Sequence, residues 1–140
     1  MSRALMHFAH TLAAVAALVV LPPGTSIAEQ IPALCSKERN QAEMTRCADQ
    51  LLRKEQAEMA KTQQELLKAT DEDSRKYVSD AQAAWQAYAD KECFSRIGGS
   101  PNRGGTIWPM MNLQCHVGLA RLRIKDLKEQ VKCPGGRMDC

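Results

Sequence analysis

The sequence predicts an all-α domain, in which three helices form an antiparallel bundle and a disulfide ties the two ends of a glycine-rich loop. Three observations support this prediction. No Gly or Pro occurs from Asn40 to Ala69, apolar residues recur at helical spacing near the end of the chain, and the 140 residues include six cysteines. Long uninterrupted stretches favour helices, and an even cysteine count in a small exported domain favours a disulfide framework.

The first 28 residues are typical of a secretory signal peptide. Arg3 supplies the positive start, Leu12–Leu21 is a short apolar run, and the small residues Ser26 and Ala28 precede the expected cleavage site. The run is too short to anchor the chain in a membrane as a stable span. A lipoprotein is the competing interpretation because Cys35 lies nearby, but the apolar run is not adjacent to it. We therefore expect a single soluble domain over residues 29–140, located in the periplasm or secreted.

Charge and size exclude several function classes. The chain has a net charge of +3, which falls to +2 when Arg3 leaves with the leader, and acidic and basic residues are mixed along it. A nucleic-acid-binding domain would carry a clustered basic face, so we expect no nucleic-acid partner.

The first helix is expected to begin after Asn40, which acts as a cap with Glu43 three residues later. It continues to about Ala69 with an apolar stripe on one face, formed by Met44, Ala48, Leu51, Met59, Thr62 and Leu66. The short polar residues of 70–74 predict a turn and a new cap. A short connection between two long helices predicts antiparallel neighbours.

The second helix is expected over 73–93 and supplies the aromatic core. Trp85 and Tyr88 lie three residues apart on one stripe, which also holds Tyr77, Ala81, Ala84 and Cys93. The chain has only two Trp and two Tyr, and aromatic side chains bury large areas. We therefore predict that Trp85 and Tyr88 are core residues.

A glycine-rich loop follows, with four Gly and one Pro between Gly98 and Gly105. A third helix is expected to begin near Trp108-Pro109 and to end before Pro134. Its apolar residues step by four and three, which predicts packing on the first two helices; they are Leu113, Val117, Ala120, Ile124, Leu127 and Val131.

This layout predicts the cysteine pairing. The first helix begins, the second ends and the third begins at one pole of the bundle, so four cysteines should meet there. We expect Cys93–Cys115 to join the two ends of the loop and Cys35–Cys47 to fold the lead-in onto the first helix. Cys133–Cys140 would close a short tail at the other pole.

The residues give no support for catalysis. His116 is the one histidine after the leader, no Cys-x-x-Cys occurs, and a lone histidine is a poor general base or metal ligand. Met110, Met111, His116 and Met138 could suggest copper ligands, but core methionines that fill gaps are the more common explanation. We therefore expect a protein that is not an enzyme and has no metal or cofactor.

Arg121 and Arg123 are the charges of most interest. They lie two residues apart on the third helix and must face different directions. A structural ion pair from one of them to Asp90 or Glu92 is the favoured interpretation, and a contact to an acidic cleft of a partner is the alternative.

Four stretches together carry a family resemblance. They are Asn40–Ala48, Ala81–Cys93, Gly98–Ser100 with Pro109-Met110, and Cys115 with Leu119, Arg121, Arg123 and Leu127. This combination resembles the family of small exported domains named after the lysozyme inhibitor LprI, over about residues 35–127. The resemblance implies a disulfide-bonded helical domain that can bind lysozyme. The sequence departs from the family pattern at Thr45, Ala89 and Ala120.

Two functions follow as hypotheses. In the first, the domain inhibits a lysozyme by inserting its loop into a cleft that carries two catalytic carboxylates. Arg103 or Asn102 at the loop tip would meet those groups, and the partner-binding set would be Gly98, Gly99, Ser100, Asn102, Arg103, Arg121 and Arg123. Because many lysozymes are strongly basic, long-range attraction would not assist this contact. In the second, the domain is a structural or interaction module that binds another envelope protein through its helical surface.

Overall fold

The computed structural model describes residues 35–99 and 105–134. These segments form three long helices and one short 3₁₀ turn, namely α2 (Gln41–Ala69), α3 (Glu72–Arg96), η1 (Gly105–Ile107) and α4 (Trp108–Lys132). No strand occurs in them, and none of their helices is both long and apolar enough to cross a bilayer. The predicted all-α class is therefore confirmed. The predicted signal peptide over residues 1–28 lies outside the described residues, as do Ser100, Asn102, Arg103 and Cys140.

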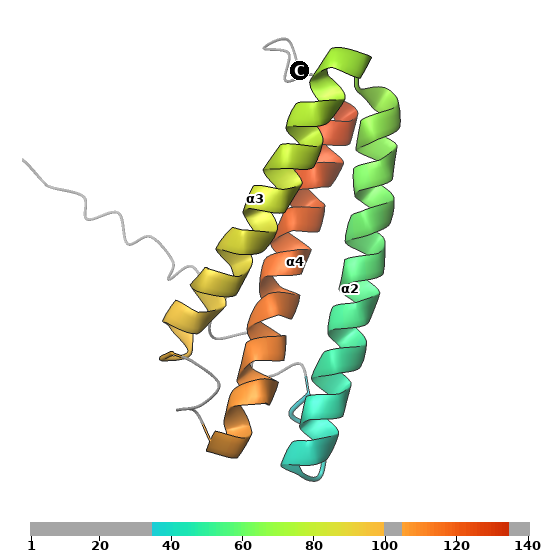
Figure 1. Ribbon diagram of the computed structural model, residues 1–140. Helices are drawn as coiled ribbons and strands as arrows, with labels where there is room; N and C mark the ends of the chain where they lie inside the picture. The colour runs from blue at the N-terminus through green and yellow to red at the C-terminus, as the bar shows by residue number, and fades with distance from the viewer. Residues whose placement is uncertain (1–34, 100–104, 135–140) are drawn as a thin grey trace, which may run out of the picture.

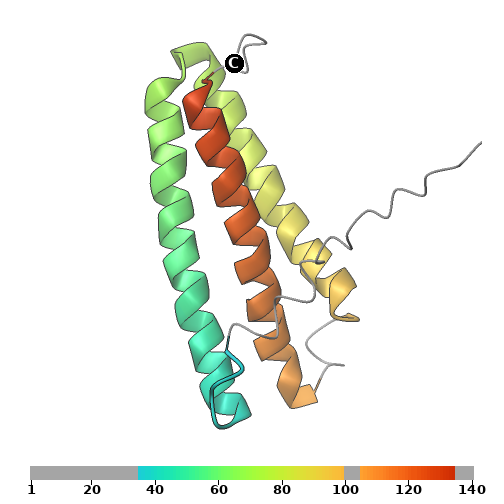
Figure 2. The same cartoon turned by 180° about the vertical axis from the view of Figure 1, so that it is seen from behind.

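The helices run antiparallel in chain order, with α4 placed between α2 and α3 (Figure 1 and Figure 2). Most of the interhelical contact is between α4 and α2, whereas α3 packs much less extensively on either neighbour. Figure 1 shows α3 joined to α2 by a tight turn at one end and splayed from it at the other.

The helix ends follow the predicted caps. Asn40 Oδ1 accepts a hydrogen bond from the backbone N–H of Glu43 at 3.0 Å, and the Glu43 carboxylate accepts one from the backbone N–H of Arg39. Asp71 Oδ1 accepts from the N–H of Ser74 at 2.9 Å and begins α3. These bonds satisfy backbone donors that the first turn of a helix leaves without partners. The cap lowers the pKa of Asp71, because the hydrogen bonds from Ser74 favour its charged form.

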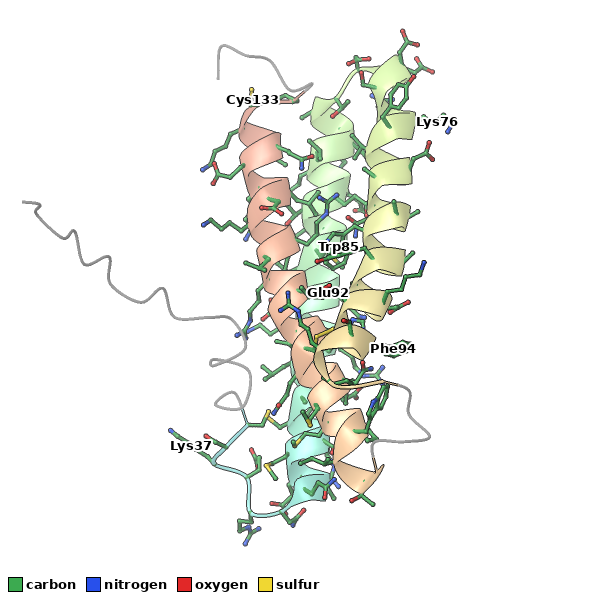
Figure 3. The ribbon with its side chains drawn as sticks, turned by 90° about the vertical axis from the view of Figure 1, so that its left-hand side faces the viewer. Lys37, Lys76, Trp85, Glu92, Phe94 and Cys133 are labelled. Carbon is green, nitrogen blue, oxygen red and sulfur yellow. A yellow bond between two sulfur atoms is a disulfide. The ribbon has the colours of Figure 1, made fainter. Side chains whose placement is uncertain are left out.

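The core consists of two apolar clusters along α4. One contains Met59, Leu66, Ile124 and Leu127, and the other contains Ala89, Leu119 and the buried cysteines 93 and 115. Trp85 packs against both clusters while remaining partly exposed. Figure 3 shows this indole lying between α3 and the other helices. The predicted stripes of α2 and α4 face this core.

The predicted core position of Tyr88 is wrong. Tyr88 is 50% exposed and Tyr77 is 74% exposed, and the two alanines on their stripe face solvent as well. The face that α3 buries is rotated by about one residue and consists of Gln82, Ala89 and Cys93, with Trp85 at its edge. Exposing an alanine side chain to water costs little free energy, and tyrosine carries a polar hydroxyl that water can solvate. These residues therefore do not have to be buried in the core.

Two predicted disulfides gather at one end of the bundle. Cys35–Cys47 and Cys93–Cys115 both form, which confirms the predicted pairing for these four residues. We call this end, where α2 begins, α3 ends and α4 begins, the disulfide pole; it is the lower end in Figure 1. Cys133 lies at the opposite end of α4 (Figure 3) and is also disulfide-bonded. Because Cys140 lies outside the described residues, Cys133–Cys140 stays a prediction.

Candidate functional site

The two ends of the glycine-rich loop are tied together by more than a disulfide. The Trp108 indole Nε1 donates a hydrogen bond to the carbonyl oxygen of Gly99 at 2.9 Å. The Trp108 ring also lies 5.6 Å from the ring of Phe94, between centroids. The N–H of Gly99 donates to the carbonyl oxygen of Phe94 at 2.8 Å and closes the end of α3. Together with Cys93–Cys115, these contacts define the loop base.

Glycine is required at the loop base by its backbone conformation. Gly98 and Gly99 have φ values of 84° and 115°. L-residues with side chains rarely adopt such values. The chain therefore turns sharply out of α3 just where Trp108 holds it. Residues 105–107 then lead directly into α4, whose first buried side chain is Trp108.

The structure contradicts the predicted ion pair from Arg121 or Arg123 to Asp90 or Glu92. Arg121 instead pairs with Glu55 of α2 at 2.9 Å. Glu92 pairs with Arg96 on its own helix. The two arginines do face different helices, because Arg123 lies toward α3. The predicted directions of the two side chains therefore hold, whereas the predicted partners do not.

Arg123 holds a buried glutamine in place. Its Nε donates to Gln82 Oε1 at 3.0 Å, and its guanidinium lies 6.0 Å from the Trp85 ring centroid. Gln82 is only 4% exposed, and its amide nitrogen donates to the Met59 sulfur at 3.4 Å. Burial lowers the pKa of Arg123, and the carboxylate of Asp126 opposes that shift. Arg123 is therefore engaged within the bundle rather than presented to a partner.

A polar groove lies between α2 and α3, with α4 as its floor, and has a volume of about 350 Å³. Four glutamines dominate its lining; the full set is Gln56, Met59, Ala60, Gln63, Gln82, Gln86, Ala89, Asp90 and His116. It carries no lysine or arginine side chain. Such a lining offers many hydrogen-bond donors and acceptors to a neutral polar molecule.

His116 and Asp90 meet at the end of the groove nearest the disulfide pole. His116 Nε2 lies 3.6 Å from Asp90 Oδ1, and the imidazole is 18% exposed. Burial lowers the pKa of His116, and the Asp90 carboxylate partly counteracts this by favouring the charged imidazole. Asp90 precedes Cys93 by three residues and His116 directly follows Cys115, so the disulfide fixes this approach. The described residues hold no group of three or more His, Cys, Asp or Glu side chains placed to share a metal ion.

Sequence reasoning missed Trp108 and the His116–Asp90 approach. The sequence predicts Trp108 only as the start of a helix, and no local pattern links it to Gly99. His116 and Asp90 belong to different helices, and their proximity depends on how α3 and α4 cross. The pairing of Cys93 with Cys115 was the available signal, because it places the residues beside these cysteines close together.

Taken together, these features define a disulfide-bonded three-helix domain whose loop base is held by Cys93–Cys115 and Trp108. Residues 35–127, more than half of the chain, match the family described as lysozyme inhibitor LprI. The chain therefore belongs to the LprI lysozyme inhibitor family. It is 32% identical over 108 residues to an uncharacterized protein of Rhizobium meliloti (strain 1021), covering 68% of this chain and 76% of that protein. No solved structure matches it.

Proposed function

We propose that this chain is an exported protein that inhibits a lysozyme by binding it, without chemistry of its own, through the loop at the disulfide pole. Family membership supports the class of partner. The two disulfides support export, because such bonds persist in oxidising compartments. The loop base supports the place of contact.

The observation that carries this proposal is the hydrogen bond from Trp108 Nε1 to Gly99 O, which lies beside Cys93–Cys115. It fixes both ends of the segment 100–104 relative to the bundle. A loop whose ends are fixed loses less conformational entropy when it binds. The segment itself holds Asn102 and Arg103, and a guanidinium can meet a carboxylate with two parallel hydrogen bonds.

A lysozyme cleft offers the matching chemistry. It carries two carboxyl groups on either side of the scissile bond. We assign the contact to these groups to Arg103, in the segment between Gly99 and Gly105, and its guanidinium would exclude the substrate. Because Arg121 and Arg123 are engaged by Glu55 and Gln82, we assign the cationic contact to Arg103 and no longer to these two residues.

The test is a turbidity assay on cell walls, with lysozymes of several types and the purified, oxidised protein. Arg103→Ala should weaken inhibition at least tenfold, because hydrogen bonds to charged groups contribute about 1.5–3 kcal/mol. Arg46→Ala is the matched control, because Arg46 is an exposed arginine near the same pole but outside the loop. It should leave inhibition unchanged.

A second variant tests the loop base. Trp108→Phe keeps an aromatic ring against Phe94 but removes the donor to Gly99. Inhibition should weaken about fivefold with helix content unchanged, since one neutral hydrogen bond contributes about 1 kcal/mol. If no lysozyme is inhibited at micromolar protein, the inhibitor proposal is wrong. A pull-down of periplasmic proteins would then test the alternative, an interaction module of the envelope.

A further inference from the structure

The solvent face of α3 carries an apolar stripe that the bundle leaves uncovered. It consists of Tyr77, Ala81, Ala84 and Tyr88, and we call it the α3 stripe. The tyrosines are 74% and 50% exposed, and both alanines are exposed. Single apolar side chains on a surface are ordinary, but here four follow one another at steps of four, three and four residues. They form a continuous ridge along about three turns of helix.

The stripe is a palindrome. Its order, Tyr-Ala-Ala-Tyr, and its spacing read the same in both directions along the helix. In an antiparallel pair of α3 helices related by a two-fold axis, Ala81 would face Ala84 of the second copy and Tyr77 would face Tyr88. Two-fold interfaces require this kind of self-complementarity, because the same patch is used on both subunits. The central alanines let the helix axes approach closely, and the tyrosines enclose them at both ends.

Charges beside the stripe fit the same register. Asp73 and Lys91 are separated by 18 residues, which is five turns of an α-helix, so they lie on the same flank. Residues on one flank meet across an antiparallel pair. Asp73 would therefore lie beside Lys91 of the second copy, with the two residues offset by about 1.5 Å along the helix axis. The two-fold axis repeats this contact at the other end of the pair. Both residues are exposed, and neither forms an ion pair within residues 35–99 and 105–134.

We propose that the α3 stripe is a homodimer interface, in which two copies of this chain pair antiparallel through α3. The helix that packs least within the bundle would gain its missing neighbour from the second copy. The stripe is short, which places the interface below about 1,200 Å² and predicts a reversible dimer. The antiparallel arrangement sets the two disulfide poles at opposite ends of the dimer. The α3 stripe does not include the loop base, so the dimer does not depend on the proposed inhibition.

Sedimentation velocity of the oxidised protein recovered after export tests this proposal. We expect the protein to be monomeric at about 1 µM. The fraction of dimer should then increase as the protein concentration is raised to about 500 µM. The double variant A81E/A84E brings four acidic side chains together at the centre of the interface and should abolish the dimer. Ala87→Glu is the matched control, since Ala87 is exposed on the same helix but lies off the stripe. It should dimerise as the wild type does.

The register has its own test. Asp73→Lys places two lysines side by side at each end and should raise the dimer dissociation constant about fivefold. The charge swap D73K/K91D should restore it to near the wild-type value. A chain that stays monomeric at all concentrations, or a dimer unaffected by A81E/A84E, would overturn the proposal. A dimer that A81E/A84E abolishes but the swap fails to restore would overturn the antiparallel register.

Discussion

Arg123 Nε donates to Oε1 of Gln82 at 3.0 Å and so links α4 to the buried face of α3. Gln82 is 4% exposed, so water could not readily replace Arg123 as the hydrogen-bond donor to its side-chain oxygen. The guanidinium also lies 6.0 Å from the Trp85 ring centroid. One side chain thus completes a polar contact and covers the principal aromatic residue of the core.

Replacing Arg123 by Ala should destabilise the domain by about 1–3 kcal/mol, since it leaves a buried acceptor without a partner and uncovers Trp85. Urea unfolding followed by circular dichroism measures this. Lys125→Ala is the matched control, an exposed cation on the same helix, and should have little effect. Similar losses in the two variants would mean that the Gln82 contact does not stabilise the fold.

Trp85→Ala should lower the free energy of unfolding by about 2–4 kcal/mol. This loss is smaller than for a fully buried aromatic residue, because Trp85 is only partly buried. The indole contacts both apolar clusters, so its removal should loosen the whole length of α3. The measurement is the change in urea midpoint at low protein concentration. Leu122→Ala, which truncates a side chain that is 40% exposed, should shift the midpoint far less.

The helices themselves could be predicted because their signals are local. Asn40 and Asp71 cap α2 and α3, and the loop glycines and Pro109 mark the passage from α3 to α4. The apolar repeats of α2 and α4 have enough contrast to identify the buried face. The antiparallel directions of the three helices bring four cysteines to one pole. Their proximity there predicts the two observed pairs.

The face of α3 could not be predicted in the same way. Alanines surround Trp85 on every side of this helix, so the pattern has little contrast, and the aromatics appeared to define the buried face. The structure instead buries Gln82, which no hydrophobic pattern would select, because Arg123 and Met59 supply its partners. The site contacts, Trp108 with Gly99 and His116 with Asp90, depend on how α3 and α4 cross and leave no local trace.

The double variant C93S/C115S should lose about 3 kcal/mol of stability. The bond closes a sequence separation of 22 residues, and releasing it restores that much conformational entropy to the unfolded chain. Urea unfolding of the oxidised variants provides the comparison. Cys35 and Cys47 are separated by 12 residues, so the matched variant C35S/C47S should lose slightly less. The reverse order would show that the lead-in contributes more than its loop length predicts.

His116 should make the domain less stable as the pH falls through the range just below 6.5. Burial lowers the pKa of this imidazole in the folded protein, whereas the unfolded chain keeps the ordinary value of 6.5. Between the two pKa values the unfolded chain binds more protons, so stability declines as the pH falls through this window and levels off below it. Asp90 is the titratable group that faces the imidazole from α3, and the groove lining from α2 adds none.

His116→Gln should remove this dependence. The measurement is the difference in free energy of unfolding between wild type and His116→Gln at a series of pH values from 7.5 to about 5. As the pH falls, the wild type should lose stability relative to His116→Gln. Glu58 and Glu129, whose pKa values are lowered by hydrogen bonds from Lys128 and Lys132, lose their contributions only in more acidic solution and equally in both proteins. Asp90→Asn should strengthen the effect, because removing the carboxylate lowers the His116 pKa further. A difference that stays constant across this range would show that the imidazole titrates alike in the folded and unfolded chains.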